Sequence, residues 1–197
     1  FLAGQYIDII RNGQKRSYSI SHNQCENNEL TLFIRNYEGG LFSQYWFSEA
    51  KANDLLRMEG PLGTFFYRNN PACEEIVLLA TGTGIAPIKA ILDQWQQQPE
   101  QVKGKKIWLL WGGRKKEDLF WQLETTLPNF TYIPVLTRED EWQGAKGYVQ
   151  EIALQQPIHW QKAQVYACGS EVMIQSAQKL LTQQGLKEEN FFSDAFV

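Results

Sequence analysis

The stretch "LLATGTGIAPIKAIL", Leu78–Leu92, decides the fold of this chain. A continuous apolar strand ends at Thr81, and a helical pattern begins near Ile85 after two glycines. Gly82 and Gly84 permit the tight turn, and the N-terminus of the helix offers unpaired N–H groups to a phosphate. The spacing differs from the ordinary G-x-G-x-x-G fingerprint, so a sharp turn without any ligand stays open as an alternative.

The chain continues beyond this stretch as alternating strands and helices. Strands are expected at 75–81, 105–113, 130–137 and 163–169, and helices at 85–98, 117–127, 146–154 and 170–185. Long apolar strands that alternate with helices indicate a parallel sheet covered on both faces.

Residues 1–70 have a different character, with short β-rich segments between polar turns. Strands are expected at 4–10, 15–21, 29–37 and, as two strands broken by Gly-Pro-Leu-Gly, in 55–68, with a loop and short helix at 39–50. The polar segment 69–75 marks the expected boundary. The predicted fold class is therefore two-domain, with an antiparallel β-barrel domain at 1–70 followed by an α/β parallel-sheet domain at 71–197.

The strand "KRSYSIS", Lys15–Ser21, carries an unusual combination of side chains. Alternation sends Arg16 and Tyr18 to one face, and Ser17 and Ser19 to the other. One cation, one flat ring and two hydroxyls would suit a flat anionic ligand.

Three further strand ends and the C-terminal tail are candidate site elements. "VYACGSEVM" repeats the strand-to-helix turn with Cys168, Gly169 and Ser170, although an isolated cysteine is as often a buried small residue. Arg114 after "WGG" and Arg138 after Thr137 could hold a phosphate or be solvated caps. The tail "FFSDAFV", 191–197, predicts a strand packed on its own domain or an aromatic lid over a flat cofactor.

Composition excludes several classes of function. The formal net charge of −3 gives no footprint for nucleic acid or an anionic membrane, and no apolar run is long enough to span a bilayer. The cysteines Cys25, Cys73 and Cys168 and the histidines His22 and His159 show no metal-ligand spacing, so no metal is expected. A reducing, cytoplasmic location is expected. Because Phe1 is not a methionine and opens a strand-like segment, a fragment of a longer chain is expected.

Taken in order, Arg-x-Tyr-Ser, Gly-x-x-Ser, Gly-Thr-Gly-Ile-Ala-Pro and Cys-Gly-Ser resemble the ferredoxin–NADP reductase superfamily. The details "GGLFSQYWF", "EGPLGTFF", "WGGR", "YACGS" and "FFSDAFV" look most like its CDP-6-deoxy-glucoseen reductase group, which are iron–sulfur flavoproteins. The resemblance implies an FAD half that lacks its first strands, followed by a whole NAD(P)H half.

The resemblance also implies roles by position. Arg16 would hold the FAD pyrophosphate, Tyr18 would stack on the isoalloxazine ring, and Ser19 would hydrogen-bond near flavin N5, the hydride acceptor. The implied catalytic residues are Ser19, Cys168 on the nicotinamide C4 side, Asp194, and Phe196 as a movable cover. The implied cofactor-binding residues are Arg16, Ser17, Tyr18, Ser19, Ile34, Asn36, Gly40, Leu41, Phe42, Ser43, Thr81, Gly82, Thr83, Gly84, Arg114, Arg138, Cys168, Gly169 and Phe196.

The implied activity is an FAD-dependent NAD(P)H reductase that passes electrons to an iron–sulfur centre or partner protein. Thr137 and Arg138 match the NADP-specific pattern only in part, and Lys146 and Tyr148 resemble the NADH-using pattern as much, which favours NADH. A 2Fe-2S cluster is expected only in a ferredoxin domain before Phe1 or in a partner. The alternatives are a free flavin reductase, the reductase component of a ring-hydroxylating oxygenase, and a nucleotide-binding module without turnover.

Overall fold

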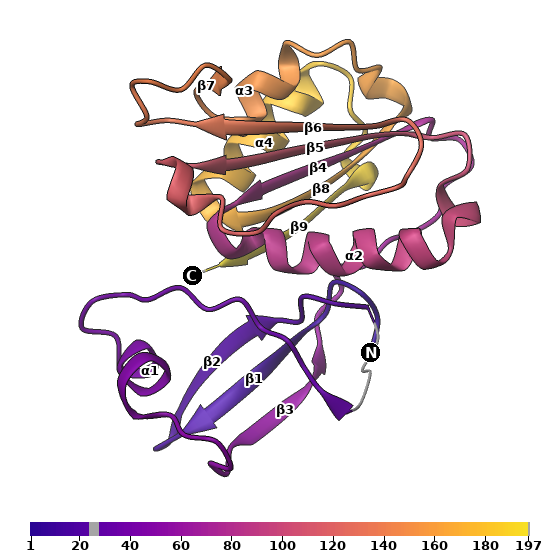
Figure 1. The fold of residues 1–197 in the computed structure, drawn as a ribbon. Coiled ribbons are helices and arrows are strands. Elements are labelled where there is room, and N and C mark those ends of the chain that lie inside the picture. Colours follow the sequence, from indigo (N-terminus) through magenta and orange to yellow (C-terminus); the bar gives the residue numbers. More distant parts are fainter. Residues whose placement is uncertain (24–27, 197) are drawn as a thin grey trace.

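The computed structural model describes residues 1–23 and 28–196 and contains two sheets, one in each half of the chain (Figure 1). Cys25 lies outside the described residues. The strands are β1 (Tyr6–Arg11), β2 (Gln14–Ser19), β3 (Arg57–Leu62), β4 (Glu75–Thr81), β5 (Lys106–Gly113), β6 (Phe130–Leu136), β7 (Ala145–Lys146), β8 (Ala163–Ser170) and β9 (Phe191–Phe196). The α-helices are α1 (Leu41–Gln44), α2 (Ile85–Gln97), α3 (Val149–Leu154) and α4 (Glu171–Gln183).

The first sheet is antiparallel, with strand order β2-β1-β3. Asn12 and Gly13 both have positive φ, which suits the two-residue turn that joins β1 to β2. Ser19 pairs with Tyr6, and Tyr6 pairs on its other side with Leu62, so these three residues form one row across the sheet. The short helix predicted in 39–50 is confirmed as α1, followed by a π-helical turn at Tyr45–Glu49.

The prediction of a strand at 29–37 is wrong. Within its described residues the segment forms a single bridge, between Leu32 and Ile20. Leu32 packs against the core of the first sheet, whereas Phe33 packs against the core of the second half. The segment therefore runs extended between two cores, where it meets no continuous strand to pair with.

The prediction of two strands in 55–68 is also wrong. β3 continues through Gly60 and Pro61, and its register with β1 shifts at this point. Because β3 is an edge strand with an irregular register, the missing N–H of Pro61 interrupts no regular ladder. The segment Thr64–Arg68 then leaves the sheet and crosses to the second half.

The second sheet has the order β7-β6-β5-β4-β8-β9, and all of its strand pairs are parallel. α2 covers the face that is turned toward the first sheet, and α3 and α4 cover the other face (Figure 1). The predicted order, antiparallel β followed by parallel α/β, is thereby confirmed, and the described antiparallel part is a three-stranded sheet.

The prediction of a helix at 117–127 is wrong. A 3₁₀ turn spans Lys116–Asp118, and the described chain then continues without a helix to β6. Phe120 meets the rings of Trp111 and Phe33 edge-on, with centroids 5.3 and 5.2 Å apart. Trp121 also packs against Trp111. These aromatic contacts with the core hold an extended path that overrides the helical propensity of the segment.

One hydrophobic core joins the two halves. It contains Ala3 and Phe65 from the first half together with α2 residues such as Ile88 and Trp95. Within the described residues, the predicted boundary at residue 70 falls between β3 and β4, and this boundary stays a prediction.

Candidate functional site

The ends of β4 and β8 lie side by side, and two glycines make this close approach possible. A Cβ atom on Gly84 would lie 2.2 Å from the carbonyl oxygen of Cys168, and one on Gly169 would lie 2.1 Å from Thr81 Oγ1. Gly169 also has a φ of +137°, a conformation that L side chains rarely adopt. The 3₁₀ turn Gly82–Gly84 therefore leads directly into α2 at the carboxyl edge of the sheet.

Side-chain hydrogen bonds fix this turn. Trp111 Nε1 donates to the carbonyl oxygen of Gly82 at 3.0 Å. The N–H of Ser170 donates to Thr81 Oγ1 at 3.1 Å, and Ser170 Oγ accepts from the N–H of Met173 at 3.4 Å, which caps α4. The N–H of Ile85 donates to the carbonyl oxygen of Gly82, so the N–H groups that lack helical partners belong to the 3₁₀ turn that precedes α2. Their role toward an anionic group stays a prediction.

Replacing Trp111 by phenylalanine should loosen the turn. The lost hydrogen bond is worth about 0.5–1.5 kcal/mol. The KM for NADH, the dinucleotide that the resemblance implies, should therefore rise roughly two- to tenfold while kcat changes little. Trp95→Phe is the matched control, because Trp95 is equally buried and its Nε1 has no described partner. Steady-state kinetics of both variants check this, and equal KM changes would contradict it.

Cys168, Asp194 and Phe196 share one face of the sheet, the face turned toward the first half. Cys168 pairs with Asp194 across β8 and β9, and Ser170 pairs with Phe196. Cys168 belongs to the core that joins the two halves, and Phe196 packs against that core. The tail forms β9, which pairs with β8 of the second sheet, so the alternative of a strand packed on its own domain is confirmed. The role of Phe196 as a cover over a cofactor stays a prediction.

Burial perturbs both titratable groups of this pair. Cys168 is fully buried, which raises the pKa of its thiol well above the ordinary value, and the charge of Asp194 adds to the shift. Burial also raises the pKa of Asp194 from 3.8 to about 6. A carboxyl group at this position therefore changes charge close to neutral pH.

Asp194 should make stability depend on pH. Because its folded pKa is raised, its contribution is fully present below about pH 4 and is lost as the pH rises through about 6. Between pH 4.5 and 7 the free energy of unfolding should fall by about 2 kcal/mol relative to Asp194→Asn. Urea unfolding of both proteins across this range measures the difference, and parallel curves would rule out the shifted carboxyl.

On the first sheet, the four residues of the Arg-x-Tyr-Ser motif have different surroundings. Arg16 is exposed, whereas Ser17 Oγ donates to Asp8 Oδ1 at 2.6 Å. The hydroxyl of Tyr18 accepts from Trp46 Nε1 at 3.0 Å, and its ring meets that of Trp46 edge-on. Ser19 is only 6% exposed, and its Oγ has no hydrogen-bond partner among the described groups. A buried hydroxyl without a partner is costly, so Ser19 is the residue of this motif that most clearly fits a ligand.

The Gly-x-x-Ser motif forms the turn that enters α1. The N–H of Gly40 donates to the carbonyl oxygen of Tyr37, and Ser43 Oγ accepts from the N–H of Tyr37 at 2.9 Å. Leu41 is exposed, and Phe42 is buried against Tyr18. Ser43 can still donate its hydroxyl proton, so the role of this turn toward a pyrophosphate stays a prediction.

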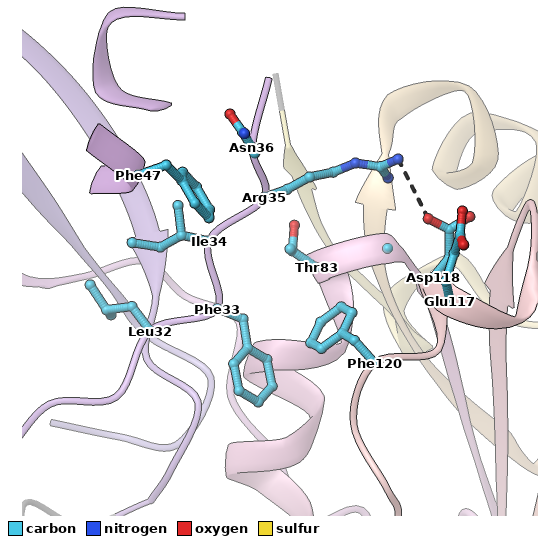
Figure 2. A pocket seen from close by; sticks show the side chains of 11 residues that line it. Leu32, Phe33, Ile34, Arg35, Asn36, Phe47, Thr83, Glu117, Asp118 and Phe120 are labelled. Carbon is cyan, nitrogen blue, oxygen red and sulfur yellow. Dashed lines mark ion pairs between the residues drawn. The ribbon is translucent and has the colours of Figure 1, made fainter. Parts of the chain in front are cut away.

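A cavity of ≈ 400 Å³ lies between the two halves (Figure 2). It is lined from the first half by Leu32, Phe33, Ile34, Arg35, Asn36 and Phe47, and from the second by Gly82, Thr83, Glu117, Asp118 and Phe120. Four residues predicted from the sequence, Ile34, Asn36, Gly82 and Thr83, therefore meet at one cavity. The other predicted site residues do not line it.

The sequence prediction missed the ion pair at this cavity. Arg35 Nη2 lies 3.5 Å from Asp118 Oδ1, and this contact joins the two halves (Figure 2). Asp118 Oδ2 also accepts from the N–H groups of Arg114 and Lys115, which orients its carboxylate. Arg35 lies between Ile34 and Asn36, which were both predicted as cofactor-binding residues. Asp118 was placed in the predicted helix 117–127, so no local signal pointed to this pair.

Arg114 and Arg138 follow neighbouring strands and meet through their backbones. The N–H of Arg138 donates to the carbonyl oxygen of Arg114 at 2.8 Å. Both side chains are exposed at the carboxyl edge of the sheet, and Tyr148 is exposed as well. Lys146 Nζ donates to the carbonyl oxygen of Asp140. The phosphate-binding role of the arginines stays a prediction.

The residues present fit the two implied nucleotides. The unpartnered Ser19 Oγ offers a hydrogen bond to a flavin, and the glycine turn offers backbone N–H groups at a helix N-terminus to a nicotinamide dinucleotide. Among residues 1–23 and 28–196, no group of three or more His, Cys, Asp or Glu side chains gathers as a metal site. Of the helices in those same ranges, none has the length and apolar character that crossing a membrane requires.

Both halves of this chain match oxidoreductase domains, and these matches give the class of the protein. Residues 1–67 match the oxidoreductase FAD-binding domain, and residues 78–179 match the oxidoreductase NAD-binding domain. Because the second match spans more than half of the chain, the chain belongs to the oxidoreductase NAD-binding domain family.

Curated relatives and solved structures agree with this assignment. The chain is 40% identical over 204 residues to the CDP-6-deoxy-L-threo-D-glycero-4-hexulose-3-dehydrase reductase of Yersinia pestis, covering 100% of this chain and 60% of the relative. It is 32% identical to the toluate 1,2-dioxygenase electron transfer component of Pseudomonas putida, covering 59% of it. The ferredoxin NADP+ reductase from Neisseria gonorrhoeae with bound FAD and NADP shares the fold, with a TM-score of 0.84 at 21% identity, covering 99% of this chain and 87% of that one. The chain thus spans about three fifths of the length of the two curated relatives.

Proposed function

We propose that this chain is the FAD- and NAD(P)H-binding part of a reductase that passes electrons from NAD(P)H through FAD to an iron–sulfur centre or a partner protein. The single observation that carries the proposal is the cavity of ≈ 400 Å³, because the flavin-side segment Leu32–Asn36 and the glycine turn at Gly82–Thr83 line it together. Two nucleotide sites that open on one cavity would allow a nicotinamide to lie against a flavin.

FAD supplies the chemistry when it is bound, since it takes up a hydride and can release electrons one at a time. The residues of the chain would orient the two nucleotides. Ser19 would hold a hydrogen bond at the flavin, and the turn Gly82–Gly84 would place the dinucleotide at near-attack distance. Asp194, with its pKa of about 6, would set the charge next to the reacting rings.

The electron acceptor is inferred from the relatives. The 40% identity to a dehydrase reductase supports an acceptor in deoxysugar biosynthesis, and the match to a dioxygenase electron transfer component supports an oxygenase as the second candidate. A plant-type 2Fe-2S cluster needs four cysteine ligands, and this chain has three cysteines. The cluster would therefore belong to a ferredoxin domain or a partner, and a cytoplasmic location stays a prediction.

The test is anaerobic reduction of the purified protein. After reconstitution with FAD, it should be yellow and should bleach on addition of NADH, and faster than with NADPH. Transfer to a plant-type ferredoxin should then exceed turnover of free riboflavin. Yellow protein that neither dinucleotide bleaches would refute the reductase, and preferential turnover of free riboflavin would favour a flavin reductase.

A further inference from the structure

The segment that leaves the first sheet is anchored to the second by one arginine. β3 ends at Leu62, which lies in the same row of the sheet as Ser19, and Arg68 follows six residues later. Arg68 Nη1 donates to the carbonyl oxygen of Phe66 at 3.1 Å, and Nη2 donates to that of Thr64 at 2.8 Å. The guanidinium group therefore fixes the path of its own segment.

The same guanidinium group contacts β9. It lies over the rings of Phe66 and Phe192, with distances of 4.2 and 4.7 Å to the ring centroids. Phe192 stands two residues before Asp194, and alternation along a strand places both on one face. Arg68 thus connects the first half to the face of β9 that carries Asp194 and Phe196.

The backbone of Arg68 is bound to β8. Its N–H donates to the hydroxyl of Tyr166 at 3.0 Å, and its carbonyl oxygen accepts from Gln164 Nε2 at 3.0 Å. Tyr166 and Gln164 are both buried, and the Tyr166 ring stacks on Phe192 with centroids 4.9 Å apart. Tyr166 also stands two residues before Cys168, on the same face of β8. One residue is therefore bound to both strands just upstream of their candidate site residues.

We propose that Arg68 is a positioning residue for hydride transfer, which fixes Asp194 and Phe196 of β9 relative to Ser19 of the first sheet. The inference rests on the proposed function. Hydride transfer is sensitive to geometry, and a displacement of 1 Å can slow such a step about 10²-fold. The cation–ring contacts and the bonds to two carbonyl oxygens need the planar fork of arginine, which lysine lacks.

The test compares Arg68→Ala, Arg68→Lys and Phe192→Leu with Arg11→Ala. Arg11 is the matched control, because it also lies 4.2 Å from a ring centroid, that of Tyr45, and pairs with Glu49, yet all of these contacts are within the first half. Phe192→Leu removes one ring and leaves the hydrogen bonds of Arg68 intact, so it serves if Arg68→Ala does not fold.

Two readouts are needed. Hydrogen exchange of the FAD-free protein should become at least about tenfold faster at residues 191–196 in Arg68→Ala, and should be unchanged there in Arg11→Ala. Flavin bleaching at saturating NADH, measured by stopped flow and normalised to bound FAD, should slow by about ten- to a hundredfold in Arg68→Ala with a smaller change in KM. Arg68→Lys should be intermediate, and Phe192→Leu should change both readouts in the same direction but less.

Faster exchange at 191–196 with an unchanged rate of flavin reduction would overturn the positioning role. Unchanged exchange would overturn the anchoring itself. A wild-type protein that no dinucleotide reduces would refute the proposed function and the catalytic part of this inference, whereas the exchange of 191–196 would still decide whether Arg68 anchors β9.

Discussion

Gly84→Ala should destabilise the protein strongly, because the added methyl group would meet the backbone of β8. The new Cβ would lie 2.2 Å from the carbonyl oxygen of Cys168, 2.6 Å from its carbonyl carbon and 2.8 Å from the nitrogen of Gly169. All three are backbone atoms of a central strand, so no side chain can rotate away. We expect the free energy of unfolding to fall by about 3 kcal/mol or more, at the upper end of what overpacking costs.

The matched control is Gly104→Ala. Gly104 has a φ of +78°, and a Cβ there would meet nothing within 4 Å, so this variant carries only backbone strain, of about 1–2 kcal/mol. Urea unfolding of both variants measures the two costs. Where Gly84→Ala folds, the displaced turn should also raise the KM for NADH, which Gly104→Ala should leave unchanged. Equal stability losses would show that β8 yields easily to the added methyl group.

Ser19→Ala should slow the reduction of bound flavin by about 10²-fold, the typical loss on removing one preorganised donor. The hydroxyl is buried and has no partner among the described groups, so its hydrogen bond is available to a ligand. FAD affinity should change little, because the resemblance assigns the pyrophosphate contacts to Arg16 and the turn Gly40–Ser43. Stopped-flow reduction by NADH and a titration with FAD separate the two effects.

Ser17→Ala is the control for this variant. Ser17 lies on the same strand, but its hydroxyl already donates to Asp8 Oδ1 at 2.6 Å. Normalised to bound FAD, its removal should leave the reduction rate within about twofold, because the resemblance assigns Ser17 to cofactor binding and not to the hydride step, and Asp8 already engages its hydroxyl. A normal rate in Ser19→Ala, or an equal loss in Ser17→Ala, would contradict the assigned role of Ser19.

Much of the second half was predictable because its signals are local. The apolar run Glu75–Thr81 has the length of a buried strand, and the glycines at 82 and 84 that follow it favour a turn, so neighbouring residues suffice to predict both. The same holds for Ser170, whose side chain caps α4. The glycine turn followed from these rules, whereas its place at the cavity depends on the first half that lines the other side.

The errors fall where distant contacts outweigh local preference. Residues 117–127 have helical propensity, but Phe120 and Trp121 pack on Trp111 and hold the segment extended. Residues 29–37 look like a strand, but Leu32 and Phe33 belong to different cores. Phe120 also packs on Phe33, which is 87 positions away in the sequence, and each of the two cores forms only when distant strands and helices pack, so no local pattern could reveal these outcomes.

The sequence by itself determined the order of the two sheets, the glycine turn and the chemical types at the candidate site, because strand period, helix period and turn residues act over a few positions. Only the tertiary structure decided which residues meet across the two halves. The pair of Arg35 with Asp118 and the contacts of Arg68 with Tyr166 and Phe192 join residues that are 83, 98 and 124 positions apart. Such contacts form only when both sheets pack on the core that they share, since hydrophobic burial, and not local propensity, brings these side chains together.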